Sequence, residues 1–225
     1  MILSIGKANN MGKCRRILWR FLSLPLLLLT LTGLLAACGD KQAADTSTLS
    51  LEEDGKLTQT IVEDKGTDDY TVQELKTYIT DSLASYTETA GEEKIQLESC
   101  TIKENVVRIC LTYDSWEDYK EYNQMPCFYG SLEEATAAGY SFERSFLTSQ
   151  GEAADASAIL AEEGDRKIFI LQEPVCVEVP GKIQYTTDNV TVSADQTAEI
   201  AGSASTNAAG QAVTVADAEA YIIFA

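Results

Sequence analysis

The sequence predicts an α+β fold, in which an antiparallel β-sheet built from hairpins carries two or three short helices packed on one side. Two stretches, 48–64 and 95–113, alternate apolar and polar residues on either side of a turn sequence, as hairpin strands do. A third stretch between them, 69–91, changes to the three-and-four spacing of an amphipathic helix. Hairpins and helices in this mixed order favour helices packed on one side of an antiparallel sheet.

The chain opens with an export signal that ends at a single cysteine. The first 37 residues contain five basic residues and no acidic one, and the segment Phe21–Ala37 is uncharged. A membrane-spanning anchor is the second choice, because this segment is shorter than the roughly 20 apolar residues that a spanning helix needs. The four residues Leu35-Ala36-Ala37-Cys38 resemble the bacterial lipobox. The resemblance implies that the Cys38 thiol is diacylglycerylated and that a signal peptidase cuts just before it.

These observations divide the chain into three parts. Residues 1–37 are a lipoprotein signal peptide, and the small, polar residues 38–47 are a flexible tether. Residues 48–225 are long enough for a single acidic α+β domain with its own core. Within it, the Ala-, Ser- and Thr-rich stretch 194–211 is expected to be a flexible loop. Acyl chains on Cys38 would hold the domain on the extracytoplasmic face of the cell membrane.

The first half of the domain has two hairpins and a helix. Asp54-Gly55 provides the turn of the first hairpin, because this dipeptide tolerates positive φ, and Glu104-Asn105 lies at the turn of the second. The helix between them starts after an N-cap at Asp69 or Thr71 and ends near Gly91. Its apolar face consists of Val72, Leu75, Ile79, Leu83 and Tyr86.

The second half begins with helices and ends with strands. Ser115 caps a short helix, "MPCFYG" forms a short strand, and Ser131 to Glu134 is a capping box that opens a helix closed by Gly139. Residues 145–165 are either a loop or a marginal helix. The remaining strands are "RKIFILQEP", "VCVEV", "GKIQYTTDNVTV" and the terminal "VTVADAEAYIIFA".

The charge of the mature chain restricts its partners. Removing residues 1–37 takes five positive charges from a chain of net charge −18 and leaves −23. Nucleic acid is excluded as a partner, because binding a polyanion needs a basic patch and the longest basic cluster lies in the removed part. Cations and cationic peptides fit better, although an acidic surface by itself serves solubility.

Several kinds of catalysis are excluded by composition. The chain has no histidine, so catalytic triads and the usual zinc sites are ruled out, and it has no nucleotide-binding glycine motif. We therefore expect no cofactor and no metal. A glycosidase pair of carboxylates has no fixed spacing and remains open; its candidates near the aromatic stretch are Glu117, Asp118 and Glu121.

Four cysteines remain after Cys14 and Cys38 are set aside. Cys100 and Cys110 lie on adjacent hairpin strands, and a three-residue turn would place them opposite each other, within reach of a disulfide. A two-residue turn would instead place Cys100 opposite Ile109. In that case all four thiols would be ordinary small core residues.

Aromatic residues are concentrated between positions 113 and 146, where nine of the 18 in the chain lie. Trp116, Tyr119 and Tyr122 recur at helical spacing, which favours a buried stripe. The alternative is a platform that contacts a peptide or glycan ligand through these rings.

The order of several segments resembles a group of uncharacterised lipoproteins of Gram-positive anaerobes of the clostridial type. These segments are "STLSLEEDGKLTQTIVED", "YTVQELKTYI", "FYGSLEEATAAGY", "VEVPGKIQYTTDNVTV" and "AYIIF". The resemblance implies a lipid anchor at Cys38 and no particular chemistry. The leading hypothesis is a non-enzymatic binding or accessory domain for a protein, peptide or glycan at the cell surface. The alternatives are a carboxylate-dependent glycan hydrolase and a structural spacer without a specific ligand.

Overall fold

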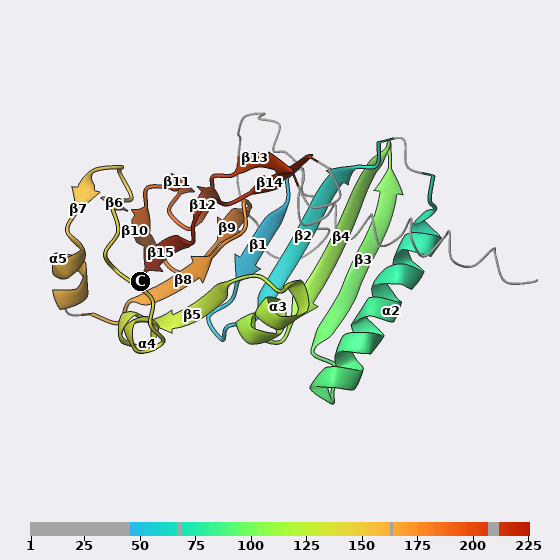
Figure 1. Cartoon of the computed structure of the whole chain (residues 1–225), viewed down its shortest axis with the longest axis horizontal. Helices are drawn as coiled ribbons and strands as arrows, with labels where there is room; N and C mark the ends of the chain where they lie inside the picture. The colour runs from blue at the N-terminus through green and yellow to red at the C-terminus, as the bar shows by residue number, and fades with distance from the viewer. Residues whose placement is uncertain (1–45, 67–68, 163, 207–211) are drawn as a thin grey trace, which may run out of the picture.

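The structure is a computed structural model that describes residues 46–66, 69–162, 164–206 and 212–225 (Figure 1). The expected signal peptide 1–37, Cys38 and nearly all of the expected tether lie outside the described residues. The predicted α+β class with mainly antiparallel strands is confirmed, and the strands are divided between two large sheets and a small hairpin.

The larger sheet has seven strands and contains both predicted hairpins. All neighbouring strands in it are antiparallel except β1 and β9, which run parallel. Across the sheet, the strands are β11 (Val190–Ala194), β12 (Thr197–Ile200), β9 (Cys176–Glu178), β1 (Thr48–Leu51), β2 (Leu57–Asp64), β4 (Val106–Tyr113) and β3 (Ile95–Lys103). Alternate residues of β4 are buried, so one face of this sheet belongs to the core.

The turn between β3 and β4 decides the state of two cysteines. Glu104 and Asn105 have φ values of 50° and 66°, which makes a tight two-residue turn that pairs Lys103 with Val106. Cys100 therefore lies opposite Ile109, and Cys110 lies opposite Ser99. Ile109 and Cys110 are successive residues whose side chains point to opposite faces, so the candidate disulfide is wrong. None of the four cysteines in the described ranges forms a disulfide.

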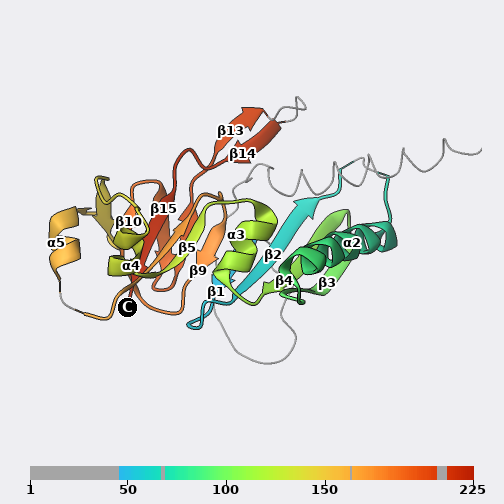
Figure 2. The ribbon, with the colours of Figure 1, turned by 60° about the horizontal axis from the view of Figure 1, so that its bottom comes forward.

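Two helices pack against the buried face of the seven-stranded sheet (Figures 1 and 2). Helix α2 (Val72–Ala90) starts at Thr71, whose side chain forms a capping box with Glu74, and ends at Gly91 with φ 82°. Helix α3 (Trp116–Asn123) starts at Ser115. In the part of the chain that the structure describes, no helix is both long and apolar enough to cross a membrane.

The second sheet has six strands and is covered on both faces. In order they are β5 (Cys127–Ser131), β8 (Lys167–Leu171), β15 (Ala220–Phe224), β10 (Ile183–Thr187), β6 (Phe146–Thr148) and β7 (Ala153–Ala154). Successive residues of β8 and β15 alternate between two core clusters, one shared with the seven-stranded sheet and one formed with the helices on the other face. These helices are α4 (Leu132–Ala137) and α5 (Ala156–Ala161).

Two segments differ from expectation. Residues 145–165 contain β6 and β7 as well as the short helix α5, because their few apolar residues pair at the edge of the six-stranded sheet. The stretch 194–211 was expected to be a flexible loop, but it contains β12 and β13 (Ser203–Thr206), and β13 pairs with β14 (Ala212–Val215). The Thr, Val and Ile residues of these segments favour strands even without a strong apolar pattern. Residues 207–211 lie outside the described ranges.

Candidate functional site

The aromatic residues of α3 pack into the core rather than forming a ligand platform. Tyr119 is fully buried, and its ring makes an edge contact with Tyr113 at 5.1 Å between centroids. Trp116 and Tyr122 are half-buried against Phe128 and Tyr86 respectively. The buried-stripe interpretation is confirmed for Tyr119, whose buried ring is not accessible to a ligand. Trp116 and Tyr122 are only partly buried, and their contact with a ligand stays a prediction.

The acidic residues of α3 do not form a free catalytic pair. The Tyr86 hydroxyl donates to Asp118 Oδ1 at 3.1 Å and to Glu121 Oε2 at 3.4 Å, so it occupies the space between the two carboxylates. Burial, helped by these carboxylates, raises the pKa of Tyr86 far above its usual value, which keeps the phenol protonated as a donor. Glu117 is exposed on the same helix. A glycosidase needs a substrate oxygen or a water where this hydroxyl lies.

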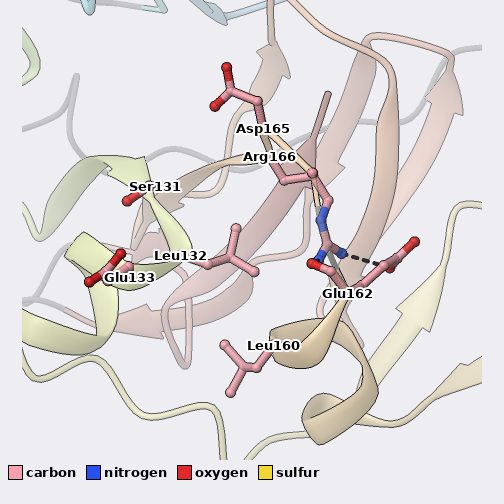
Figure 3. A pocket seen from close by; sticks show the side chains of 8 residues that line it. Ser131, Leu132, Glu133, Leu160, Glu162, Asp165 and Arg166 are labelled. Atoms are coloured by element: carbon pink, nitrogen blue, oxygen red, sulfur yellow. Dashed lines mark hydrogen bonds and ion pairs between the residues drawn. The ribbon is translucent and has the colours of Figure 1, made fainter.

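A small pocket of about 200 Å³ lies elsewhere, between α4 and α5 (Figure 3). One wall is the start of α4 and the other is the end of α5 with the loop after it. The Leu132 and Leu160 side chains lie between Glu133 on one side and the Glu162–Arg166 pair on the other. The lining residues are Ser131, Leu132, Glu133, Leu160, Glu162, Gly164, Asp165 and Arg166.

The most buried polar group of this pocket is the Arg166 guanidinium, whose side chain is only 6% exposed. Its Nη2 donates to the carbonyl oxygens of Ile159 at 2.6 Å and Glu162 at 2.7 Å, which are carbonyls at the end of α5. Its Nη1 donates to Glu162 Oε2 at 2.8 Å, and the Tyr185 hydroxyl donates to the same oxygen at 3.2 Å. Within the described residues, the buried Nε has no hydrogen-bond partner. Through these bonds Arg166 holds the end of α5, which forms one wall of the pocket, in place.

The electrostatics of the pocket favour a positively charged group. Three acidic residues, Glu133, Glu162 and Asp165, and one basic residue, Arg166, line the pocket, so the lining carries an excess of negative charge. Leu160 is 44% exposed, which is unusual for a large apolar side chain in this protein. An amine on a short apolar stem would match both features, and the volume is below that of ordinary drug-sized sites.

The sequence identifies Ser131 to Glu134 as a helix cap but assigns no binding role to any residue of this pocket. Leu160, Glu162 and Asp165 fall in the stretch 145–165, for which the sequence predicts a loop or a marginal helix. They meet Ser131 only because α4 and α5 cover the same face of the six-stranded sheet. No motif or spacing connects them. Among the described residues, no group of three or more metal-ligating side chains is placed to hold a metal ion.

Comparison of the chain with protein-family models, with curated proteins and with solved structures gives no match in any of the three.

Proposed function

We propose that this protein is a lipid-anchored, extracytoplasmic binding domain without catalytic activity. The observation that carries the proposal is the run Leu35-Ala36-Ala37-Cys38 at the end of a basic and then apolar leader. The resemblance to lipoproteins of Gram-positive anaerobes supports the same location. Diacylglyceryl modification of Cys38 supplies two acyl chains, enough for stable anchoring.

The binding site of the proposal is the α4–α5 pocket, and its ligand is a positively charged group on a protein or peptide. The pocket lining supports a cationic ligand through Glu133 and Asp165, and the net charge of the mature chain attracts cations at longer range. The same charge disfavours nucleic acid.

The glycan-hydrolase alternative has less support, because Tyr86 occupies the space between Asp118 and Glu121. The spacer alternative differs from the proposal in one respect only, which is that it has no specific ligand. A binding measurement therefore separates the two.

The anchor is tested by intact-mass analysis of protein extracted from membranes, with and without lipoprotein signal peptidase activity. The expected mature chain begins at acylated Cys38, and blocking the peptidase leaves the leader attached. A chain without acyl groups, or with the leader retained in normal cells, would refute the anchor.

The pocket is tested by NMR titration of residues 46–225 with Nα-acetyl-lysine amide and, as a matched probe, with its Nε-acetylated form. The charged probe is expected to shift the amide signals of Leu160 and Asp165, and the neutral probe is not. Glu133→Gln should weaken these shifts, whereas Glu88→Gln on the exposed side of α2 should not. Equal shifts with both probes would refute the selectivity for a positive charge, and no shift with either probe would favour the spacer alternative.

A further inference from the structure

The length of the chain between Cys38 and the first strand restricts which part of the domain meets the membrane. Ser47 is already fixed to β2, because its Oγ donates to the Val62 carbonyl oxygen at 3.2 Å and accepts from the Val62 amide at 3.0 Å. Nine Cα–Cα steps separate Cys38 from Ser47. Whatever their conformation, they span at most about 30 Å, at 3.3–3.6 Å per residue.

Ser47 lies at one end of the seven-stranded sheet, which we call the tether rim. The rim consists of residues 46–48, 63–66, 69–71 and 103–106. Its segments are joined by the Lys65 amide donating to the Asn105 carbonyl oxygen at 2.7 Å and by the Asn105 side chain donating to Asp64 at 2.7 Å. In Figure 1 this rim is the upper end of β1 to β4 and of α2.

The opposite end of the same strands, the acidic rim, consists of residues 52–56, 91–94 and 114–118. It carries eight acidic and two basic residues, whereas the described part of the tether rim carries four acidic and two basic ones. Strand β3 has nine residues, so the two rims are about 30 Å apart at roughly 3.3 Å per residue. This separation exceeds the Debye length of about 8–10 Å in physiological salt.

A second feature marks the tether side. The register pairs Thr48 of β1 with Cys176 and Cys176 with Glu199, so β12 ends level with the start of β1. The β13–β14 hairpin follows directly after this point; it lies at the upper edge of the domain in Figure 1 and projects from the body in Figure 2. The sequence from Ile200 to Ala216 contains no charged residue. An uncharged hairpin can approach lipid headgroups without electrostatic repulsion.

We propose that the tether rim and the β13–β14 hairpin face the lipid surface and that the acidic rim points away from it. The proposal rests on the proposed lipid anchor at Cys38. The anionic membrane repels the acidic rim, and the short connection holds the other end close, so both effects favour the same orientation.

This orientation also places the proposed binding site. The Tyr129 hydroxyl of β5 donates to the Glu53 carbonyl oxygen at 3.0 Å, which ties β5 to the acidic rim, and α4 follows β5 directly. The α4 wall of the pocket therefore lies toward the outward end of the domain. Ligands in the surrounding medium reach it without passing the membrane.

The test measures fluorescence quenching of acylated protein, added from detergent to preformed phosphatidylcholine–phosphatidylglycerol vesicles that carry TEMPO-labelled headgroups. Cys110→Ser and Cys176→Ser first remove the two half-buried thiols, and the buried thiols of Cys100 and Cys127 are retained. Single cysteines are then introduced and labelled with bimane at three exposed positions, by Lys103→Cys, Ser205→Cys and Glu53→Cys.

We expect the labels at positions 103 and 205 to lose most of their fluorescence and the label at position 53 to keep it. Flotation of the same samples reports anchoring separately, with unacylated Cys38→Ser protein as the control that stays in solution. Flotation with equal quenching at positions 53 and 103, or with stronger quenching at 53, would overturn the orientation alone. Failure of the acylated protein to float would refute the anchor and the orientation with it.

Discussion

The contact between Tyr119 and Glu173 joins the two chain segments that cross from one sheet to the other. Helix α3 connects β4 of the larger sheet to β5 of the smaller one, and Glu173 lies between β8 and β9, which cross back. The fully buried Tyr119 donates its hydroxyl to Glu173 Oε2. Burial raises the pKa of Glu173, and the hydrogen bond from Tyr119 opposes this rise by stabilising the carboxylate.

We expect Tyr119→Phe to lower the free energy of unfolding by about 1.5–3 kcal/mol at neutral pH, the range for a hydrogen bond to a charged group. For a domain of this size, that corresponds to a decrease in Tm of about 3–12 °C. The loss should depend on pH. Since the hydroxyl stabilises the ionised carboxylate, its removal raises the pKa of Glu173 further. The loss of unfolding free energy in the variant is therefore largest at pH values where Glu173 is ionised.

The sign of the dependence follows from the raised pKa of Glu173 in the folded state. Its ionisation on burial is unfavourable, so its contribution to stability is greatest at low pH and is lost as pH rises through the folded-state pKa. Below that pKa the carboxyl is neutral. The cost of Tyr119→Phe should then fall to about 0.5–1.5 kcal/mol, the range for a neutral hydrogen bond.

The assay is urea unfolding at several pH values, followed by the fluorescence of Trp116, which is the single tryptophan after residue 37. Tyr122→Phe is the matched control, because Tyr122 lies on the same helix as Tyr119 but its hydroxyl donates to a neutral group, the Ser82 Oγ, at 3.0 Å. Its cost should not change with pH. If the cost of Tyr119→Phe did not decrease as the pH was lowered through the titration of Glu173, or if it never exceeded the cost of Tyr122→Phe, the reasoning would be refuted.

Three further predictions concern other parts of the molecule. Arg166→Met should lower the free energy of unfolding in urea by about 1.5–3 kcal/mol, because the carbonyls at the end of α5 lose their charged donor; an unchanged midpoint would contradict this role. Gly202→Ala should cost about 1–3 kcal/mol in thermal unfolding, because its Cβ would lie 2.4 Å from Thr214 Cγ2 and 2.6 Å from Pro174 Cβ; an unchanged Tm would refute the tight contact. Thiol titration of residues 46–225 with Ellman's reagent should find four reactive thiols in the unfolded protein. In the native protein, the half-buried Cys110 and Cys176 should react slowly, since burial raises the pKa of Cys176 to about 11, and the buried Cys100 and Cys127 should be protected. A mass 2 Da lower without reductant would show a disulfide and contradict this.

The sequence alone determined the features that depend on neighbours along the chain. The capping boxes at Thr71 and Ser131, the turn at Gly55 and the alternation of β4 each require only residues within a few positions. The α+β class follows from them. The expected lipid anchor at Cys38 is of the same kind, because a short contiguous motif specifies it.

The tertiary structure decided whatever depends on which distant segments meet. The apolar runs of β8 and β15 indicate strands, but only pairing shows that they form the middle of a second sheet covered on both faces. The turn at Glu104-Asn105 could have had two or three residues, and its register alone separated Cys100 from Cys110. The pocket combines α4 with the end of α5, which are far apart in the sequence. Local patterns fix the elements because propensity, capping and periodicity act over a few residues, whereas the sheet order and the site result from long-range burial that no local pattern encodes.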